Sequence, residues 1–434
     1  MNPTAARGGI RGAGYALPEA ASPPAAPRNP TPMTSAAVAD PLLRFRSRFP
    51  ILSNTTYLIS NSLGAMPEET EQDLLEYART WKTRGVRAWA ETWWDLAREV
   101  GDIVASIVNA PKDSVSMHQN VTIAEAVVIS AFDWSGPRNG VVYTSMNFPS
   151  VRYLYDTLAR ARGGRITEVP SKDGIGVPTE AMLAAIDERT LLVPMSHVLF
   201  QSAYIQDAKA ICAKAKAVGA HVVLDGYQSV GTVPVDVKEL GCSFLIGGTL
   251  KWLCGGPGGA FLYVRDDLIN TMAPKFTGWM AHPEPFAFEG PPMRYTTGAY
   301  RWMNGTPNVP ALYACRAGPK IIREAGAHAI RAKSQHQTKR LVEAGLAEGW
   351  DVRAPMNPAQ RGGTVAFNVP NAKSVKFELL ARDVIVDYRP GAGIRVSPHF
   401  YNSDEECDRA VAEIKDILAT GAWRRHETVK TVVT

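Results

Sequence analysis

A lysine and an aspartate in the middle of the chain could together perform cofactor chemistry. The apolar run of residues 221–224 ends on Asp225, and a second apolar run, residues 242–246, is followed by Lys251 in a turn bounded by glycines. In an open α/β sheet, both side chains would lie at the carboxyl ends of strands, where such folds bind ligands. The lysine amine can form a Schiff base with an aldehyde, and the aspartate can keep a pyridine nitrogen protonated. Without further signals nearby, an aspartate and a lysine at such positions would more often be two unrelated surface residues.

Neighbouring residues favour a pyridoxal phosphate (PLP) site over that alternative. Gln228 lies one helical turn past Asp225 and could reach the phenolic oxygen of the cofactor, while Thr249 offers a hydroxyl to a phosphate. Glycines on both sides of Pro257 allow the backbone to pass close to a ligand. In these features residues 221–263 resemble the fold-type I PLP enzymes of the class V aminotransferase group. The resemblance implies an Asp-x-x-Gln element and a lysine-plus-glycines element in one site.

The composition and charge of the chain narrow the class of protein. A length of 434 residues leaves room for a large core and two domains. Apolar runs are too short to span a membrane, so we expect no membrane partner. The net charge of +5 is spread along the chain, which gives no reason to expect a nucleic-acid partner. The five cysteines are scattered without metal-ligand spacing, so we expect reduced cysteines of a cytoplasmic protein and no metal site.

The order of elements predicts an α/β fold with two domains and a tail. Residues 1–38 are rich in Pro, Ala and Gly, and we expect a mobile tail rather than the transit peptide that its arginines faintly resemble, with Met33 as an alternative start. Strands alternate with helices up to residue 263, which implies a mostly parallel sheet. From the resemblance we expect a large PLP-binding domain with a seven-stranded sheet at residues 66–309. An N-terminal arm (39–65) and residues 310–434, which begin with a bridging helix, would form a smaller α+β domain.

Three positions before the central stretch are candidate cofactor contacts. Val121 and Thr122 open the helix that begins after Asn120, where free N–H groups and the helix dipole favour a phosphate. An ordinary Thr N-cap is the alternative, but the family places a phosphate-binding Ser or Thr here. Phe148 follows the strand at residues 140–144 and could stack on a pyridine ring, as in related enzymes, or pack in the core. His197, at the end of the strand at residues 191–197, is equally consistent with a structural role.

Several motifs resemble kynureninases in particular. Asn61 and Ser62, in the sequence NSLG, match a loop that lines the amino-acid end of the substrate in that family. The amphipathic segment at residues 84–110, with its tryptophans, is similar too, although core packing explains most of it. Trp279 and Thr306 lie on Gly- and Pro-rich loops that the family sends across a dimer interface to the partner's cofactor. The resemblance therefore implies a homodimer with shared active sites.

Arg395 is the candidate for binding the substrate carboxylate. It lies between apolar residues on a predicted strand, where a guanidinium is costly without an anionic partner. The planar fork of arginine suits an α-carboxylate, and the matching arginine of kynureninases holds one. A buried ion pair is the alternative.

The resemblance covers residues 50–418 and implies kynureninase chemistry. In that reaction Lys251 would move the α-proton of the substrate, water would add to the γ-carbonyl, and cleavage of Cβ–Cγ would release anthranilate and then alanine. Two positions depart from the family: Leu250 replaces a Tyr that contacts the phosphate, and Gln228 stands where kynureninases have His, as in desulfurases and isopenicillin-epimerase-like proteins. The loop at residues 355–364 lacks the nucleophilic cysteine of persulfide-forming desulfurases. An aminotransferase, a β-eliminating C–S lyase or an epimerase acting on a different amino acid are the alternatives, and a non-catalytic PLP carrier would have no use for Lys251 and Arg395.

Overall fold

The computed structural model describes residues 40–429, so the predicted N-terminal tail at residues 1–38 lies outside the described residues. The described chain opens with two short 3-10 helices, η1 (Pro41–Arg48) and η2 (Pro50–Ser53), and a short strand, β1 (Thr56–Tyr57). A helical region follows, in which α1 (Glu68–Arg84) leads through a 3-10 turn and then a π-helical turn into α2 (Trp94–Ile107). The predicted amphipathic segment is therefore helical, but it is a regular α-helix only from Trp94 onward.

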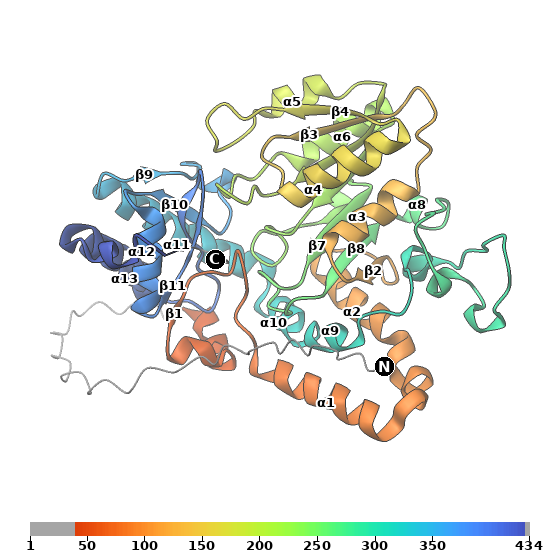
Figure 1. Ribbon diagram of the computed structural model, residues 1–434, viewed down its shortest axis with the longest axis horizontal. Helices are drawn as coiled ribbons and strands as arrows, with labels where there is room; N and C mark the ends of the chain where they lie inside the picture. Colours follow the sequence, from red (N-terminus) through yellow and green to blue (C-terminus); the bar gives the residue numbers. More distant parts are fainter. Residues whose placement is uncertain (1–39, 430–434) are drawn as a thin grey trace, which may run out of the picture. The chain divides into compact units, whose positions relative to one another are not determined.

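A seven-stranded sheet is the largest sheet of the described chain (Figure 1). In their order across the sheet, the strands are β2 (Val115–His118), β8 (Ala260–Val264), β7 (Phe244–Gly248), β6 (His221–Asp225), β5 (Thr190–Ser196), β3 (Gly140–Thr144) and β4 (Arg165–Val169). The run from β7 to β4 is parallel, whereas β8 is antiparallel to both of its neighbours. This arrangement confirms the mostly parallel, seven-stranded sheet of a fold-type I enzyme.

Helices cover both faces of this sheet, because its strands are apolar on both sides. Alternate residues of β6 belong to different cores: Val222 and Leu224 pack with one face, Val223 with the other. One face packs against α2, α10 (Ala317–Ala325) and three helices of the parallel half, which are α5 (Thr179–Ala185), α6 (Ala208–Val218) and α7 (Val237–Leu240). The other packs against α3 (Val121–Ser130), α4 (Pro149–Leu154) and the π-helical turn η5 (Tyr155–Ala159). Such two-sided covering is what a buried parallel sheet requires.

A second hydrophobic core surrounds a four-stranded antiparallel sheet. Its strands, in order across the sheet, are β12 (Asp387–Arg389), β13 (Gly393–Val396), β10 (Val365–Asn368) and β9 (Asp351–Val352). Three helices complete it: α11 (Ala327–Ala347), α12 (Ala372–Ala381) and α13 (Asp404–Thr420). The N-terminal residues pack on this second core, because β1 pairs in parallel with β11 (Val384–Ile385) and Leu58 is fully buried in it.

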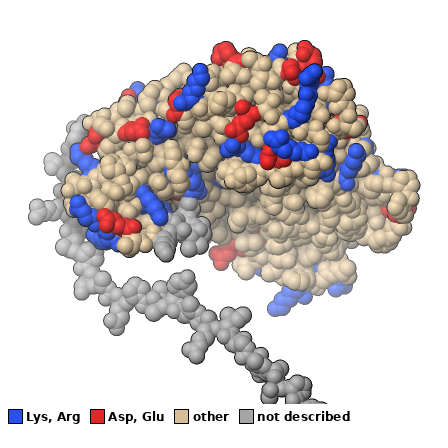
Figure 2. Space-filling model, turned by 45° about the horizontal axis from the view of Figure 1, so that its top comes forward, with Lys and Arg blue, Asp and Glu red and all other residues tan. Residues whose placement is uncertain are grey.

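Two shorter helices lie between β8 and α10 in the sequence. α8 (Asp266–Ile269) follows the sheet, and α9 (Val309–Ala314) precedes α10 and α11. No helix among residues 40–429 is long and apolar enough to cross a membrane. On the face shown in Figure 2, basic and acidic side chains lie beside one another. Arg340 and Asp408 form an ion pair in which both side chains are exposed.

Candidate active site

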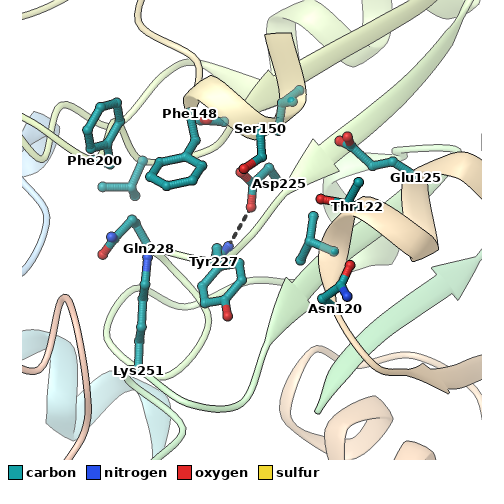
Figure 3. Close-up of a pocket in the computed structure, with 14 residues that line it drawn as sticks. Asn120, Thr122, Glu125, Phe148, Ser150, Phe200, Asp225, Tyr227, Gln228 and Lys251 are labelled. Atoms are coloured by element: carbon teal, nitrogen blue, oxygen red, sulfur yellow. Dashed lines mark hydrogen bonds between the residues drawn. The ribbon is translucent and has the colours of Figure 1, made fainter. Parts of the chain in front are cut away.

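A pocket of about 230 Å³ lies at the carboxyl ends of the central strands (Figure 3). It is bounded by the first turns of α3 and α4, the end of β5, the turn after β6 and the lysine that follows β7. The predicted residues that line it are Val121, Thr122, Phe148, Asp225, Gln228 and Lys251. The fold thus brings together side chains from five segments that are far apart in the sequence.

Asp225 and Lys251 face this pocket from neighbouring strand ends. Asp225 is the last residue of β6 and is 7% exposed, and its Oδ1 accepts a hydrogen bond from the Tyr227 backbone N–H at 2.9 Å. Burial raises the pKa of Asp225, while the Tyr227 N–H, the Lys251 charge and the Ser196 side chain act in the opposite direction. The carboxylate is therefore desolvated but has compensating donors.

The amine of Lys251 is partly buried and lies beside two aromatic rings. Its Nζ lies 4.3 Å from the centroid of the Tyr227 ring and 5.8 Å from that of Phe148. Burial lowers the pKa of Lys251 to about 7, the charge of Arg395 acts in the same direction, and Asp225 and Asp387 oppose it. An amine with such a pKa is largely available as a nucleophile or base near neutral pH.

The first turn of α3 offers the pocket an anion-binding end. The N-cap is Asn120, whose Oδ1 accepts from the Ile123 backbone N–H at 3.0 Å. Thr122 is therefore not the cap, and its hydroxyl and the N–H groups of the first turn lie at the pocket. Backbone donors and the helix dipole at such a position favour a phosphate.

Phe148 is a pocket residue and not part of the core. Its side chain is 41% exposed, and it packs edge-to-face on Phe200 with ring centroids 5.1 Å apart. Figure 3 shows both rings at the same side of the cavity. A planar ligand could stack against Phe148 between that side and Asp225.

Gln228 has a fixed amide orientation and connects the pocket to the predicted substrate loop. Its Oε1 accepts from Trp252 Nε1 at 2.9 Å, and its Nε2 donates to the Asn61 carbonyl at 3.0 Å. The second hydrogen on Nε2 is left for a ligand acceptor. Asn61 is 1% exposed and neither atom of its side-chain amide has a hydrogen-bond partner within residues 40–429. Buried amides are rarely unpaired, which suits a ligand at this position; the neighbouring Ser62 is partly buried.

Thr249 does not line the pocket, which corrects the expectation that it meets a phosphate. Its hydroxyl is buried and donates to the carbonyls of Gly256 and Gly259, at 3.2 and 3.1 Å, and contacts Cys315 Sγ. A Cβ at Gly259 would lie 2.8 Å from this hydroxyl, which is too close. The turn therefore needs a glycine at this position to accommodate the Thr249 side chain. Thr249 stabilises the turn that holds Lys251.

Arg395 forms the buried ion pair that was the alternative to a carboxylate site. Its Nε donates to Asp387 Oδ1 at 2.8 Å, its Nη2 donates to Asp387 Oδ2, and its Nη1 donates to the Phe200 carbonyl. The two side chains are 2% and 0% exposed. The argument that this guanidinium needs an anion from the substrate is wrong, because Asp387 supplies its counter-charge.

Trp279 and Thr306 lie outside the pocket of their own chain. Thr306 is exposed, and Trp279 packs against Trp94 and Phe286 with ring centroids 5.6 Å apart in both pairs. The single chain thus does not bring them to Lys251. Their predicted contact with a partner's site stays a prediction.

Comparison with known proteins agrees with this geometry. The family model described as "Aminotransferase class-V" matches residues 56–409. The chain belongs to the class-V aminotransferase family. An uncharacterized aminotransferase, YcbU, from Bacillus subtilis is 32% identical over 86% of this chain and 96% of the relative. Kynureninase from Bacillus anthracis is 29% identical over 91% of this chain and 95% of its own length. A structure of a C-DES variant with glycine covalently linked to its PLP cofactor has a TM-score of 0.78 at 19% identity, covering 86% and 99% of the two chains.

The pocket also contains residues that sequence reasoning missed. They are Glu125, Ser150, Phe200 and Tyr227, together with Ser196. Glu125 follows Thr122 by one helical turn, so helix periodicity could have placed it on the same face. Tyr227 lies between Asp225 and Gln228, but Phe200 follows no motif. His197 faces a separate groove that Gln206 also lines, because successive residues of a strand point to opposite sides.

Proposed function

We propose that the protein is a PLP-dependent enzyme acting on an α-amino acid, with Lys251 carrying the cofactor. The observation that supports this most is a lysine amine of lowered pKa and a buried carboxylate, Asp225, lining one pocket with a helix N-terminus. The pocket contains a suitable group for each part of PLP. The first turn of α3 and Thr122 would bind the phosphate, and Asp225 would pair with the pyridine nitrogen. Phe148 would stack on the ring, and Gln228 would donate to the phenolic oxygen.

The residues of the pocket then have distinct tasks. When bound, PLP supplies an electron sink that stabilises negative charge at the α-carbon of an attached amino acid. Lys251 takes and returns the α-proton, because its amine is deprotonated in a substantial fraction of molecules near neutral pH. Asp225 keeps the pyridine nitrogen protonated, and the rings of Phe148 and Tyr227 lie beside the Lys251 amine.

The reaction we favour is hydrolysis of the Cβ–Cγ bond of L-kynurenine or a related amino acid with a γ-carbonyl, which consumes water and yields alanine and a carboxylic acid. Support comes from the similarity to kynureninases along nearly their whole length and from the unpaired Asn61 amide beside Gln228. The similarity to YcbU supports transamination as the second candidate. Elimination at a C–S bond and epimerisation use the same first proton transfer.

Two experiments test these assignments. Borohydride reduction of the PLP-loaded protein followed by peptide mapping should place the label on Lys251; a label on Lys238 or Lys275 would refute the assignment. Incubation with L-kynurenine and a panel of other amino acids, with products identified by mass, separates the reactions: alanine formed without an added keto acid supports hydrolysis, and products that require a keto acid support transamination.

We also propose a homodimer with shared sites, since Thr306 and Trp279 lie on loops outside their own pocket. Mixing a Lys251→Ala variant with a Thr306→Ala variant should restore part of the activity, because one of the two hybrid sites then has both residues. Failure of the mixture to exceed either variant, with subunit exchange demonstrated, would refute the shared site.

A further inference from the structure

Glu125 is a second carboxyl group in the candidate pocket. It lies on α3 one turn after Thr122, lines the cavity and is 1% exposed. Figure 3 shows its side chain leaving α3 on the side of the cavity where Asp225 lies. Within residues 40–429, neither of its oxygens has a hydrogen-bond partner. A buried carboxylate without a donor is costly, so this side chain requires either a proton or a ligand that pairs with it.

The groups around Glu125 do not favour its ionised form. Asp225 on β6 repels a second negative charge, and the Tyr155 hydroxyl on η5 is buried without a partner. The pocket's cation, Lys251, interacts with Asp225. Burial and the Asp225 charge raise the pKa of Glu125 well above its ordinary value.

The two carboxyl groups are not equivalent. Asp225 receives the Tyr227 N–H at 2.9 Å and is stabilised by Lys251 and Ser196, whereas Glu125 has none of these donors. When two carboxyl groups share a desolvated site, the proton stays on the one with fewer compensating interactions. Glu125 is that group.

We propose that Glu125 holds a proton in the resting pocket and acts as a positioning residue for Asp225, which is then the only ionised carboxylate among the described residues that line the pocket. The neutral carboxylic acid also presents a hydroxyl donor to an acceptor atom of whatever fills the cavity between α3 and Asp225. Its effect on the cofactor rests on the proposed function, but its protonation state does not. Ionisation of Glu125 would place a second negative charge beside Asp225, so its titration sets an alkaline limit for the pocket.

Infrared spectroscopy of the apoprotein tests the protonation state directly. A buried neutral carboxylic acid absorbs in the C=O region outside the amide bands, and we expect such a band at about pH 7 in the wild type. It should be absent in Glu125→Gln and in Glu125→Met, a second variant in case the first does not fold. Glu378→Gln is the matched control, because Glu378 is 2% exposed but is ion-paired with Arg382 and its pKa is lowered. A wild-type spectrum without a band that depends on Glu125 would overturn the proposal.

The stability of the apoprotein as a function of pH gives an independent test. A carboxyl group whose pKa is raised on folding reduces stability as the pH rises from its unfolded pKa through its folded pKa. Glu125→Gln should therefore gain thermal stability relative to the wild type as the pH rises above the ordinary pKa of a glutamate, because the wild type loses stability over that range. Glu378→Gln should change in the opposite direction, because its carboxylate stabilises the fold above its unfolded pKa. A pH-independent difference for Glu125→Gln would contradict a neutral Glu125.

The link to Asp225 is tested with PLP present. In the wild type, the affinity for PLP should fall at alkaline pH as Glu125 ionises, and in Glu125→Gln this loss should shift or disappear. An unchanged alkaline loss would refute the link to Asp225 even where the infrared band confirms the neutral acid. Absence of PLP binding to wild type and variants alike would instead refute the proposed function, so the two failures are distinguishable.

Discussion

The buried Arg395–Asp387 pair makes the sharpest prediction about stability. Asp387→Ala leaves the Arg395 guanidinium buried without a counter-ion and also removes the carboxylate that lies 3.6 Å from Arg389. Breaking a buried pair by removing one partner costs about 3–5 kcal/mol, since the remaining charge keeps its desolvation penalty. Arg395→Met should cost less than Asp387→Ala, because Asp387 would keep Arg389 as a neighbour. We expect Asp387→Ala to be at the upper end of this range.

An exposed pair of the same geometry is the matched control. Arg340 Nε and Nη2 donate to both oxygens of Asp408 at 2.5 Å, but these side chains are 44% and 48% exposed. Water screens such a pair, so Asp408→Ala should cost at most about 1 kcal/mol. The assay is urea unfolding of the apoproteins followed by tryptophan fluorescence. The dependence of the unfolding free energy on urea concentration must be equal in the variants before their transition midpoints are compared.

A double variant completes the test. Replacing both partners, as in Arg395→Met with Asp387→Leu, removes both buried charges and should be less destabilising than Asp387→Ala alone. An Asp387→Ala loss no larger than that of Asp408→Ala would refute the reasoning, because it would mean that Arg395 has another anion or is hydrated. A substrate carboxylate would then again be a candidate partner for Arg395.

Three further predictions concern the pocket. Trp252→Phe removes the 2.9 Å hydrogen bond to Gln228 Oε1 and should cost about 1 kcal/mol of stability and a few-fold in PLP affinity; unchanged affinity in a titration monitored by absorbance would contradict a fixed Gln228. Asp225→Ala should lower turnover per bound cofactor by on the order of 10²–10³-fold, and a change confined to PLP retention would contradict its role at the pyridine nitrogen. Because the pKa of Lys251 is lowered to about 7, the rate at which apoprotein captures PLP should rise with pH and reach half its maximum near that value, as only the deprotonated amine reacts; a half-point near the ordinary pKa of lysine would refute the desolvation of this amine.

The sequence alone was sufficient for the elements that hold Asp225 and Lys251. Continuous apolar runs that end on polar residues are typical of buried parallel strands, and the alternation with helices predicts the sheet that brings the two ends together. The structure confirms the seven-stranded sheet and places both side chains at one pocket. Local pattern was enough here because each feature depends on neighbours within one strand, turn or helix.

Tertiary structure decided which polar side chains face the pocket and which are satisfied elsewhere. Thr249 stands two residues before Lys251 in the sequence, yet its hydroxyl is bonded to the glycine turn. Arg395 was correctly predicted to need an anion, but its partner Asp387 is reached only because β12 and β13 pair with these residues opposite each other. In the sequence, Glu125 is an ordinary helix residue. In the fold, β6 places Asp225 near it, and no hydrogen-bond donor from the described residues reaches its carboxyl group. The charge and hydrogen bonding of a buried group depend on atoms brought from distant segments, and sequence spacing carries no record of those atoms.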